Sequence, residues 1–231
     1  MPGNAGSSSV LVRGGHRTEV VTSAGLKREV RGEMAGWVGH GELGRAGRRL
    51  LLAAAALVLL SFAFPLWQVK LIAPQYPEGL TLAVYAWGLR GKLDIINTLN
   101  HYVGMREIRP EDFPELRLIP VAFLGVVLLS AVAAWTGRRW IALVLIVLAP
   151  VVGLLGVLDL WYRLYLYGHT LDPDAPIRVP PFTPPILGSQ RLANFITSAT
   201  FHVGTLLHLV AFALIVLAYW RSGPWPGRPR S

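Results

Sequence analysis

The chain has 231 residues, of which 53% are hydrophobic and only 15% are charged, and this is typical of a polytopic membrane protein rather than a soluble domain. The formal net charge of +9 comes mainly from basic residues that flank apolar segments, so membrane topology explains it and nucleic acid is not expected as a partner. The chain has no cysteine, which excludes disulfides, thiolate metal sites and covalent c-type haem attachment.

The N-terminal part of the sequence is rich in glycine, serine and arginine and shows no sustained periodicity. This pattern predicts a basic, disordered arm over residues 1–47. A membrane domain over 48–220 follows, and its first spanning helix is expected at about 50–67. Pro65 and Trp67 mark the end of that helix, because proline breaks a helix and tryptophan is common at the bilayer interface.

Three further apolar segments predict spanning helices at about 119–135, 140–160 and 201–220. A tight turn at 136–139 joins the second and third of the four helices, and a basic tail, 221–231, ends the chain. The predicted fold class is therefore an all-α integral membrane protein with four transmembrane helices.

The basic residues also predict the orientation. The N-terminal flank, the turn between the second and third helices and the C-terminal tail are all basic. With four helices these three regions lie on one side, which the positive-inside rule places in the cytoplasm together with both termini. The loops 68–118 and 163–199 then face the periplasm or cell exterior, where we expect them to form a small ordered cap.

A short amphipathic helix is predicted at 93–108, within the first of these loops. Asp94, Asn97, His101 and Met105 are spaced three or four residues apart, so they share one helix face. Imidazole and thioether one turn apart are suitable ligands for Cu(I), and a neutral histidine also serves Cu(II) or zinc. The alternative is a surface helix whose His and Asn side chains bond to nearby backbone.

The second loop contains a proline-rich segment, 168–188, whose regular admixture of apolar residues predicts an ordered strap packed over the helix ends or on the 93–108 helix. His169 could add a metal ligand there. Asp172 could do the same, but an Asx turn before Pro173 is the favoured interpretation. In the first loop, Glu78 lies in a proline- and glycine-rich turn and could act as a ligand or an ion-pair partner.

Three polar residues lie within or beside the predicted spans. Asp159 precedes Arg163 by four residues, which favours an ion pair at the interface over a functional carboxylate facing a cavity. His202 begins the last helix on the outer side and could reach the loops. His208 lies about 9 Å deeper by the helical rise, and we expect it to bond to another helix.

Four long strings of the sequence resemble one group of small, uncharacterised multi-pass bacterial membrane proteins: Phe64–Trp67, Ala73–Leu80, Leu99–Met105 and Gly168–Ile177. This group is associated with gene clusters for nitrous-oxide reductase maturation and copper delivery. The resemblance covers about 64–195. It implies an accessory role in the bacterial inner membrane, with copper as the cofactor or cargo.

The leading functional hypothesis is therefore an accessory membrane protein rather than an enzyme. Its cap would dock a periplasmic or membrane protein partner and hold or pass copper through His101 and Met105, with His169 or His202 completing the site. Six further residues could support the site or face the partner: Asn97, Asn100, Tyr102, Glu78, Asp159 and Asp172.

A second hypothesis is a membrane subunit of an electron-transfer complex. Aromatic residues near the outer interface would form a quinol pocket or a cytochrome dock, although an aromatic belt accounts for the same residues. They are Trp67, Trp87, Tyr102, Trp161, Tyr162, Tyr165 and Tyr167. A membrane hydrolase ranks last, because the sequence contains neither a G-x-S-x-G nor an H-E-x-x-H motif.

Overall fold

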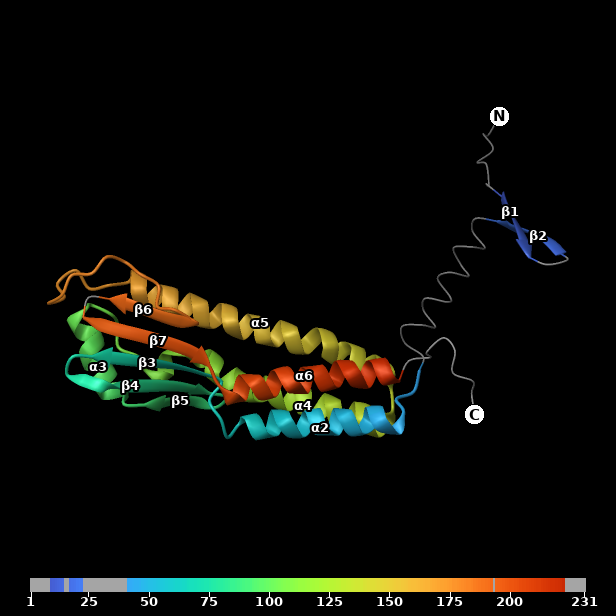
Figure 1. Cartoon of the computed structure of the whole chain (residues 1–231), viewed down its shortest axis with the longest axis horizontal. Helices are drawn as coiled ribbons and strands as arrows, with labels where there is room; N and C mark the ends of the chain where they lie inside the picture. The colour runs from blue at the N-terminus through green and yellow to red at the C-terminus, as the bar shows by residue number, and fades with distance from the viewer. Residues whose placement is uncertain (1–8, 15–16, 23–40, 193, 223–231) are drawn as a thin grey trace, which may run out of the picture.

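The computed structural model describes residues 9–14, 17–22, 41–192 and 194–222. Four long helices run side by side, and a five-stranded antiparallel sheet extends from one end of them (Figure 1). The prediction of an all-α fold is therefore wrong, because the chain has a mixed α/β fold. The two segments that we expected to form a cap supply every strand of this sheet.

The helical bundle has four members, and they are α2 (Arg45–Ser61), α4 (Leu118–Thr136), α5 (Arg139–His169) and α6 (Val203–Arg221). Within the described residues, three helical segments are long and apolar enough to cross a membrane: Pro114–Thr136, Arg139–His169 and Val203–Arg221. The helix α2 has 17 residues and is the shortest of the four. It begins five residues and ends six residues earlier than the predicted 50–67.

The helix α5 is much longer than predicted, because it continues past residue 160 to His169. Its 31 residues span about 46 Å at the α-helical rise. A bilayer core is about 30 Å thick. About three turns at the end of α5 therefore extend beyond the length of the other helices and lie beside the sheet (Figure 1).

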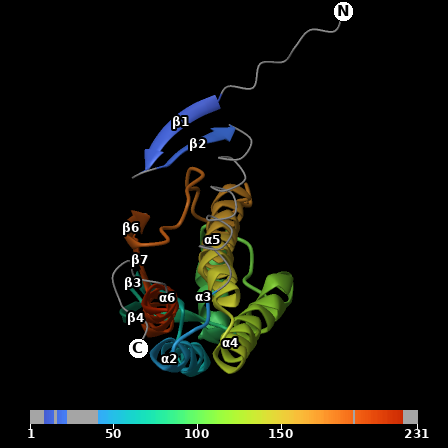
Figure 2. The same ribbon diagram turned by 90° about the vertical axis from the view of Figure 1, so that its right-hand side faces the viewer.

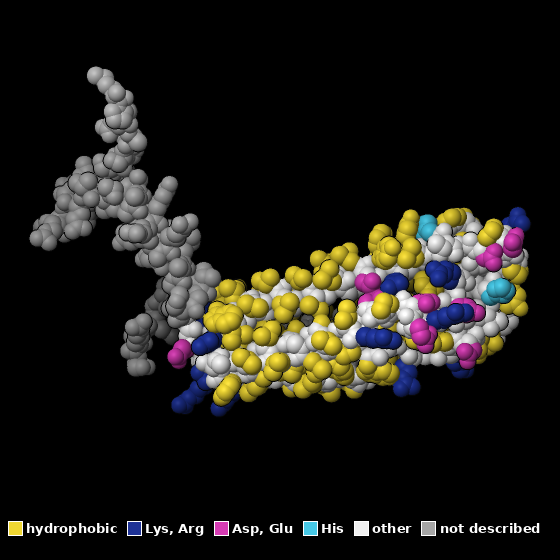
Figure 3. Space-filling view, turned by 180° about the vertical axis from the view of Figure 1, so that it is seen from behind, with side chains coloured by type: hydrophobic (Ala, Val, Ile, Leu, Met, Phe, Trp, Pro, Cys, Tyr) yellow, Lys and Arg dark blue, Asp and Glu magenta, His cyan; other side chains and the backbone are white. Residues whose placement is uncertain are grey.

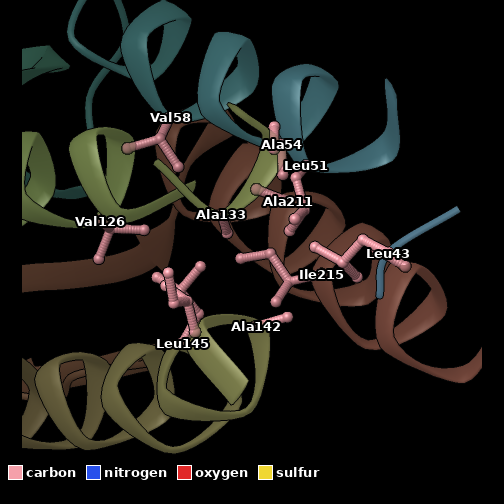
Figure 4. Close-up of a cluster of buried hydrophobic side chains, with 13 residues drawn as sticks. Leu43, Leu51, Ala54, Val58, Val126, Ala133, Ala142, Leu145, Ala211 and Ile215 are labelled. Atoms are coloured by element: carbon pink, nitrogen blue, oxygen red, sulfur yellow. The ribbon is translucent and has the colours of Figure 1, made fainter. Parts of the chain in front are cut away.

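Small residues hold the bundle core together. Ala54, Ala133, Ala142 and Ala211 are almost fully buried where the helices meet, and this lets their backbones approach closely (Figure 4). Viewed along the bundle, α2, α4 and α6 form one group, and α5 lies to one side (Figure 2). Leu145 is the last residue of α5 buried in this core.

The end of the bundle opposite the sheet is closed by backbone and arginine contacts. Gly137 takes a left-handed conformation (φ 71°) in the turn between α4 and α5. The Leu43 amide donates to the Gly137 carbonyl at 2.7 Å, and Arg48 Nε donates to the Leu43 carbonyl at 3.1 Å. The guanidinium of Arg139 stacks 4.1 Å from the ring centre of Tyr219. The three basic flanks therefore meet at one end of the molecule.

The sheet has the order β5-β4-β3-β7-β6, and every neighbouring pair is antiparallel. Its strands are β3 (Trp67–Ala73), β4 (Tyr76–Tyr85), β5 (Gly88–Gly91), β6 (Gly188–Leu192) and β7 (Phe195–Phe201). The strand β3 follows α2, and β7 leads into α6. The central strand pair therefore continues the α2–α6 helix pair.

Hydrogen bonds link the junction between α2 and β3 to the junction between β7 and α6. The Leu66 carbonyl accepts from the His202 amide at 2.9 Å and from the Thr205 hydroxyl at 2.7 Å. The Gly204 amide donates to the Pro65 carbonyl at 2.9 Å. His202 thus caps the start of α6 at the base of the sheet.

The strands form because apolar residues alternate along them. Trp67, Val69 and Leu71 of β3 face the same side of the sheet, where Leu80 and Leu82 of β4 join them. The predicted turn at 74–79 is only partly correct, because Pro74 and Gln75 alone form the turn and β4 begins at Tyr76.

A short helix, α3 (Leu93–Tyr102), packs its Ile96 and Leu99 on the apolar face of the sheet. Two 3₁₀ turns, Pro110–Asp112 and Pro114–Arg117, then lead to α4. Near the middle of the bundle, His208 bonds to the Gly204 carbonyl of its own helix and lies against Phe123 of α4. The expected hydrogen bond to another helix is therefore wrong.

The N-terminal part differs from the predicted disordered arm over 1–47 where it is described. The strands β1 (Ser9–Gly14) and β2 (Arg17–Thr22) pair as an antiparallel hairpin. The helix α2 already begins at Arg45. Residues 1–8, 15–16 and 23–40 of the predicted arm, and residues 223–231 of the predicted tail, lie outside the described residues.

We expect Gly204→Ala to destabilise the protein, because its Cβ would lie 2.6 Å from the Pro65 carbonyl oxygen. Overpacking of this kind costs about 1–3 kcal/mol, so the melting temperature in detergent should fall by several degrees. The matched control is Gly125→Ala in α4, whose Cβ would meet no atom within 4 Å. Equal melting temperatures for the two variants would contradict the close packing at this junction.

Candidate functional site

The apolar face of the sheet and the last turns of α5 enclose a chamber of about 160 Å³. The helix α3 and the segment around Phe182 and Pro184 complete its walls. Aromatic residues contribute much of the lining, and they are Trp67, Phe113, Tyr167, Phe182 and Phe195. The chamber is almost entirely apolar, so it is suited to a lipophilic group rather than to an ion.

One face of α5 forms the chamber wall opposite the sheet. Leu160, Arg163, Leu164 and Tyr167 all line the chamber, and their spacing of three or four residues places them on one side of the helix. This signal is present in the sequence. It was missed because aromatic and apolar side chains also lie on the other faces of this segment, which reduces the contrast between helix faces.

Immediately N-terminal to these residues, α5 has no close neighbours in the described part of the chain. Residues 153–158 are exposed on every side of the helix. A Cβ added at Gly153 or Gly156 would meet no atom within 4 Å. The helix has therefore separated from the bundle core before it reaches the chamber, and the surface between α5 and its neighbours is hollowed and flanked by hydrophobic side chains (Figure 3).

The proline-rich strap closes the chamber at its far end. The Ile177 amide donates to the Tyr102 carbonyl at 2.9 Å, which confirms that the strap packs on the end of α3. Trp67 Nε1 donates to the Ile186 carbonyl at 2.7 Å, and the Phe182 amide donates to the Gly168 carbonyl at 3.0 Å. Gly168 is required there, because any Cβ would overlap the Phe182 carbonyl.

The helix predicted at 93–108 ends at Tyr102 instead. Gly104 takes a left-handed conformation (φ 76°), which turns the chain out of the helix before Met105. As a result Met105 lines the chamber, whereas His101 is exposed and does not line it. The expected shared face of His101 and Met105 is therefore wrong.

Asn97 has the structural role that the alternative interpretation gave it. Its side chain accepts from the Ile108 amide at 2.8 Å and donates to the Ile108 carbonyl at 3.1 Å. This pair of bonds holds the segment after α3 against the helix. Asn97 is thus occupied in fixing the chamber wall.

Asn100 is the most unusual polar residue of the site. It is only 7% exposed, and it lies on the chamber lining. Its backbone carbonyl accepts from the Met105 amide at 2.9 Å, but its side-chain Nδ2 has no hydrogen-bond partner. A buried amide donor is usually paired, so an unpaired one is unusual.

Arg163 of α5 connects the chamber to two carboxylates. Its Nη2 donates to Glu115 at 2.6 Å, and its Nε lies 3.9 Å from Asp159. The predicted Asp159–Arg163 pair is therefore present, but the shorter contact is with Glu115, which the sequence could not reveal because 48 residues separate the two. The guanidinium also lies 5.3 Å from the ring centre of Phe113.

A second, polar recess of about 190 Å³ adjoins the chamber. Arg163 and Tyr167 line both spaces. Arg106, Asp112 and Thr170 also line the recess, so it holds groups of both charge signs. The site as a whole is an apolar chamber with a polar rim.

The remaining metal-ligand candidates do not line the chamber. His169 is exposed, stacks on Tyr165 at 3.9 Å and bonds to the carbonyl of that residue. His202 lies at the base of the sheet, where β7 meets α6. Within the described residues, no three His, Cys, Asp or Glu side chains gather in a way that could hold a metal ion. Copper binding therefore stays a prediction.

Three other candidates lie on the surface. Asp172 Oδ1 accepts from the Asp174 amide at 2.9 Å, which confirms the Asx turn before Pro173. Glu78 and Tyr102 are exposed. Docking of a protein partner on these residues stays a prediction.

No protein-family model matches the chain, and no curated protein matches it either. The resemblance to proteins of nitrous-oxide reductase maturation therefore stays a prediction, and the functional argument depends on the chamber itself.

We expect Trp67→Phe to loosen the strap, because the Ile186 carbonyl loses its donor. An unsatisfied buried polar group costs about 1–3 kcal/mol, so amide hydrogen exchange in residues 182–187 should rise at least several-fold. The control is Trp87→Phe, which removes a bond to the Phe62 carbonyl at an exposed position. Unchanged exchange in Trp67→Phe would show that this bond does not hold the strap.

Proposed function

We propose that the chain is an integral membrane protein that binds one lipophilic molecule, drawn from the bilayer, in the chamber between the sheet and α5. The apolar chamber beside the free-standing part of α5 carries this proposal. The activity that follows is binding and presentation rather than catalysis. It develops the second sequence-based hypothesis, in which aromatic residues at the outer interface form a quinol pocket.

The size and lining of the chamber support an occupant. Its volume of about 160 Å³ is close to that of an engineered apolar cavity, about 150 Å³, that binds benzene. The chamber is partly open rather than sealed, so an apolar molecule can enter it from outside.

The exposed stretch of α5 supports entry from the membrane. Residues 153–158 are all exposed, so lipid tails can reach both flanks of the helix. The chamber-lining face begins just above, at Leu160. A lipophilic molecule could thus pass along α5 from the bilayer into the chamber without crossing water.

The placement in the membrane is also part of the proposal. We place α4, α5 and α6 across the bacterial inner membrane, with α2 as a fourth and shorter span. Arg48, Arg139 and Arg221 belong to the end opposite the sheet, which supports a cytoplasmic location for both termini. The sheet and the chamber then lie on the extracytoplasmic side.

The first test fills the chamber from the α5 side. Leu164→Trp adds bulk at a lining residue, so the amount of lipophilic molecule that co-purifies per chain should fall about tenfold, since a clash of 1–3 kcal/mol opposes binding. The measurement is mass spectrometry of an organic extract from the detergent-purified protein.

The matched control is Leu158→Trp on the same helix, where the side chain is exposed. This variant should keep the wild-type occupancy. Equal occupancy in the two variants, or no lipophilic molecule in the wild-type protein, would contradict the proposed function.

The second test addresses the orientation and uses the absence of cysteine. We expect Gln75→Cys, in the exposed turn between β3 and β4, to react with a membrane-impermeant maleimide in spheroplasts. Thr136→Cys, at the α4–α5 turn, should react only after the membrane is permeabilised. The reverse pattern would place the sheet in the cytoplasm.

A further inference from the structure

We infer that the lipophilic molecule is a phospholipid whose head group carries a phosphate and a primary ammonium, and that this head group lies in the polar recess beside the chamber. This inference rests on the proposed function. It specifies the chemical class of the ligand and gives the recess a role, which the proposed function leaves unused.

The recess and the chamber are neighbouring parts of one site, because Arg163 and Tyr167 of α5 line both of them. The chamber is almost entirely apolar, whereas Arg106, Asp112 and Thr170 line the recess. A pure hydrocarbon would fill the chamber alone. An amphiphile matches both spaces, with a hydrocarbon chain against the sheet and a head group in the recess.

Two opposite charges in the recess have no partner. Arg106 and Asp112 are both exposed, and neither side chain forms an ion pair within the described residues. Both charges act on the hydroxyl of Tyr167, which places them near the same side chain. A ligand with one negative and one positive group can pair with both. A ligand with an anion alone would be repelled by the carboxylate of Asp112.

Two other arginines near the recess are already engaged. Arg163 donates to Glu115 at 2.6 Å, and Arg109 donates to Glu107 at 2.6 Å. The positive charge that remains for a phosphate is therefore the guanidinium of Arg106, which can bind phosphate oxygens through two parallel hydrogen bonds.

The hydroxyl groups of the recess favour a primary ammonium. Tyr167 donates its hydroxyl hydrogen to the Glu107 carbonyl at 3.2 Å, and Thr170 donates to the Leu166 carbonyl at 2.7 Å. Toward a ligand these hydroxyls can act only as acceptors, like the carboxylate of Asp112. A primary ammonium brings three donors to such a set, whereas the quaternary ammonium of choline brings none.

The chamber lining is suited to a hydrocarbon chain. Residues of all five strands line it, from Leu89 of β5 to Leu192 of β6, so the apolar surface reaches across the whole sheet. At the usual strand spacing this is about 19 Å from edge to edge. A flexible chain can lie along such a surface, and the remainder of the lipid follows α5 past Leu160 and the exposed residues 153–158 into the bilayer.

The experiment offers three phospholipids in an equimolar mixture to the full chain in detergent: phosphatidylethanolamine, phosphatidylglycerol and phosphatidylcholine with identical acyl chains. The immobilised protein is washed, and the bound lipid is quantified by mass spectrometry. We expect phosphatidylethanolamine to be enriched about three- to fivefold over each of the other two, because an ion pair at an exposed position contributes a factor of this order.

The variant Asp112→Asn removes the partner of the ammonium and the repulsion that acts on a lone anion. The preference for phosphatidylethanolamine over phosphatidylglycerol should therefore fall to about twofold or less. The control is Asp174→Asn, the same substitution at an exposed position of the strap outside the recess, and it should keep the wild-type preference.

The variant Arg106→Gln removes the partner of the phosphate. The amount of phosphatidylethanolamine bound, relative to a diacylglycerol with the same chains, should fall about threefold. The control is Arg178→Gln, at another exposed position of the strap outside the recess, and it should leave this ratio unchanged.

The outcomes separate the two proposals. Equal enrichment of the three phospholipids by the wild-type protein, or a preference for phosphatidylglycerol, overturns the head-group inference but leaves lipophile binding intact. An unchanged preference in Asp112→Asn also overturns it. Displacement of the bound lipid by an excess of soluble phosphoethanolamine, which has no chains, would show that the recess acts without the chamber and would contradict the amphiphile. If no lipid binds, diacylglycerol included, the proposed function itself fails.

Discussion

The pairing of β3 with β7 directly above the α2–α6 helix pair is the constraint on which the rest of the structure depends. The strand β3 begins a few residues after α2 ends, and α6 begins directly after β7. The Leu66 carbonyl links these two helix–strand junctions, because it accepts hydrogen bonds from the His202 amide and the Thr205 hydroxyl. The sheet therefore cannot tilt independently of the bundle. Because the orientation of the sheet is fixed in this way, its apolar face meets α5 at a defined angle, and the remaining strands, α3 and the strap assemble around that face.

The part of α5 that extends beyond the other helices completes the chamber. A helix that ended with its neighbours would leave the apolar face of the sheet open to solvent. By continuing to His169, α5 covers that face and contributes Arg163, which Glu115 holds in place from the 3₁₀ turn before α4. The chamber is thus built by segments from both halves of the chain. Its polar groups are few, and two of them are held by neighbouring residues: Arg163 donates to Glu115, and the Tyr167 hydroxyl donates to the Glu107 carbonyl.

The sequence predicts the parts of this molecule that are set by local hydropathy. The helices α4 and α6 agree with the predicted spans within two residues, and so does the start of α5. The sheet was missed, although Trp67, Val69 and Leu71 alternate with more polar neighbours, because short strands between long apolar runs are easily assigned to loops. Of the chamber residues, Met105 was named as a metal ligand, and Trp67 and Tyr167 were named for an aromatic pocket. Gly104 ends α3 early, so Met105 lines the chamber instead of sharing a face with His101. The Glu115–Arg163 contact depends on tertiary structure and has no local signal.

The attachment of α5 has a mechanical consequence. The helix is anchored at the bottom by the Gly137 turn and the core around Leu145, and at the top by the strap that packs on Gly168. Between these anchors it contains Pro150, Gly153 and Gly156, and within the described residues a Cβ added at either glycine would meet no atom within 4 Å. A thinner or thicker bilayer presses on this unsupported stretch, and the proline, which lacks an amide hydrogen, makes it the easiest place to bend. Bending there changes the distance between α5 and the sheet, so in the proposed membrane placement the thickness of the bilayer sets the width of the chamber outside it.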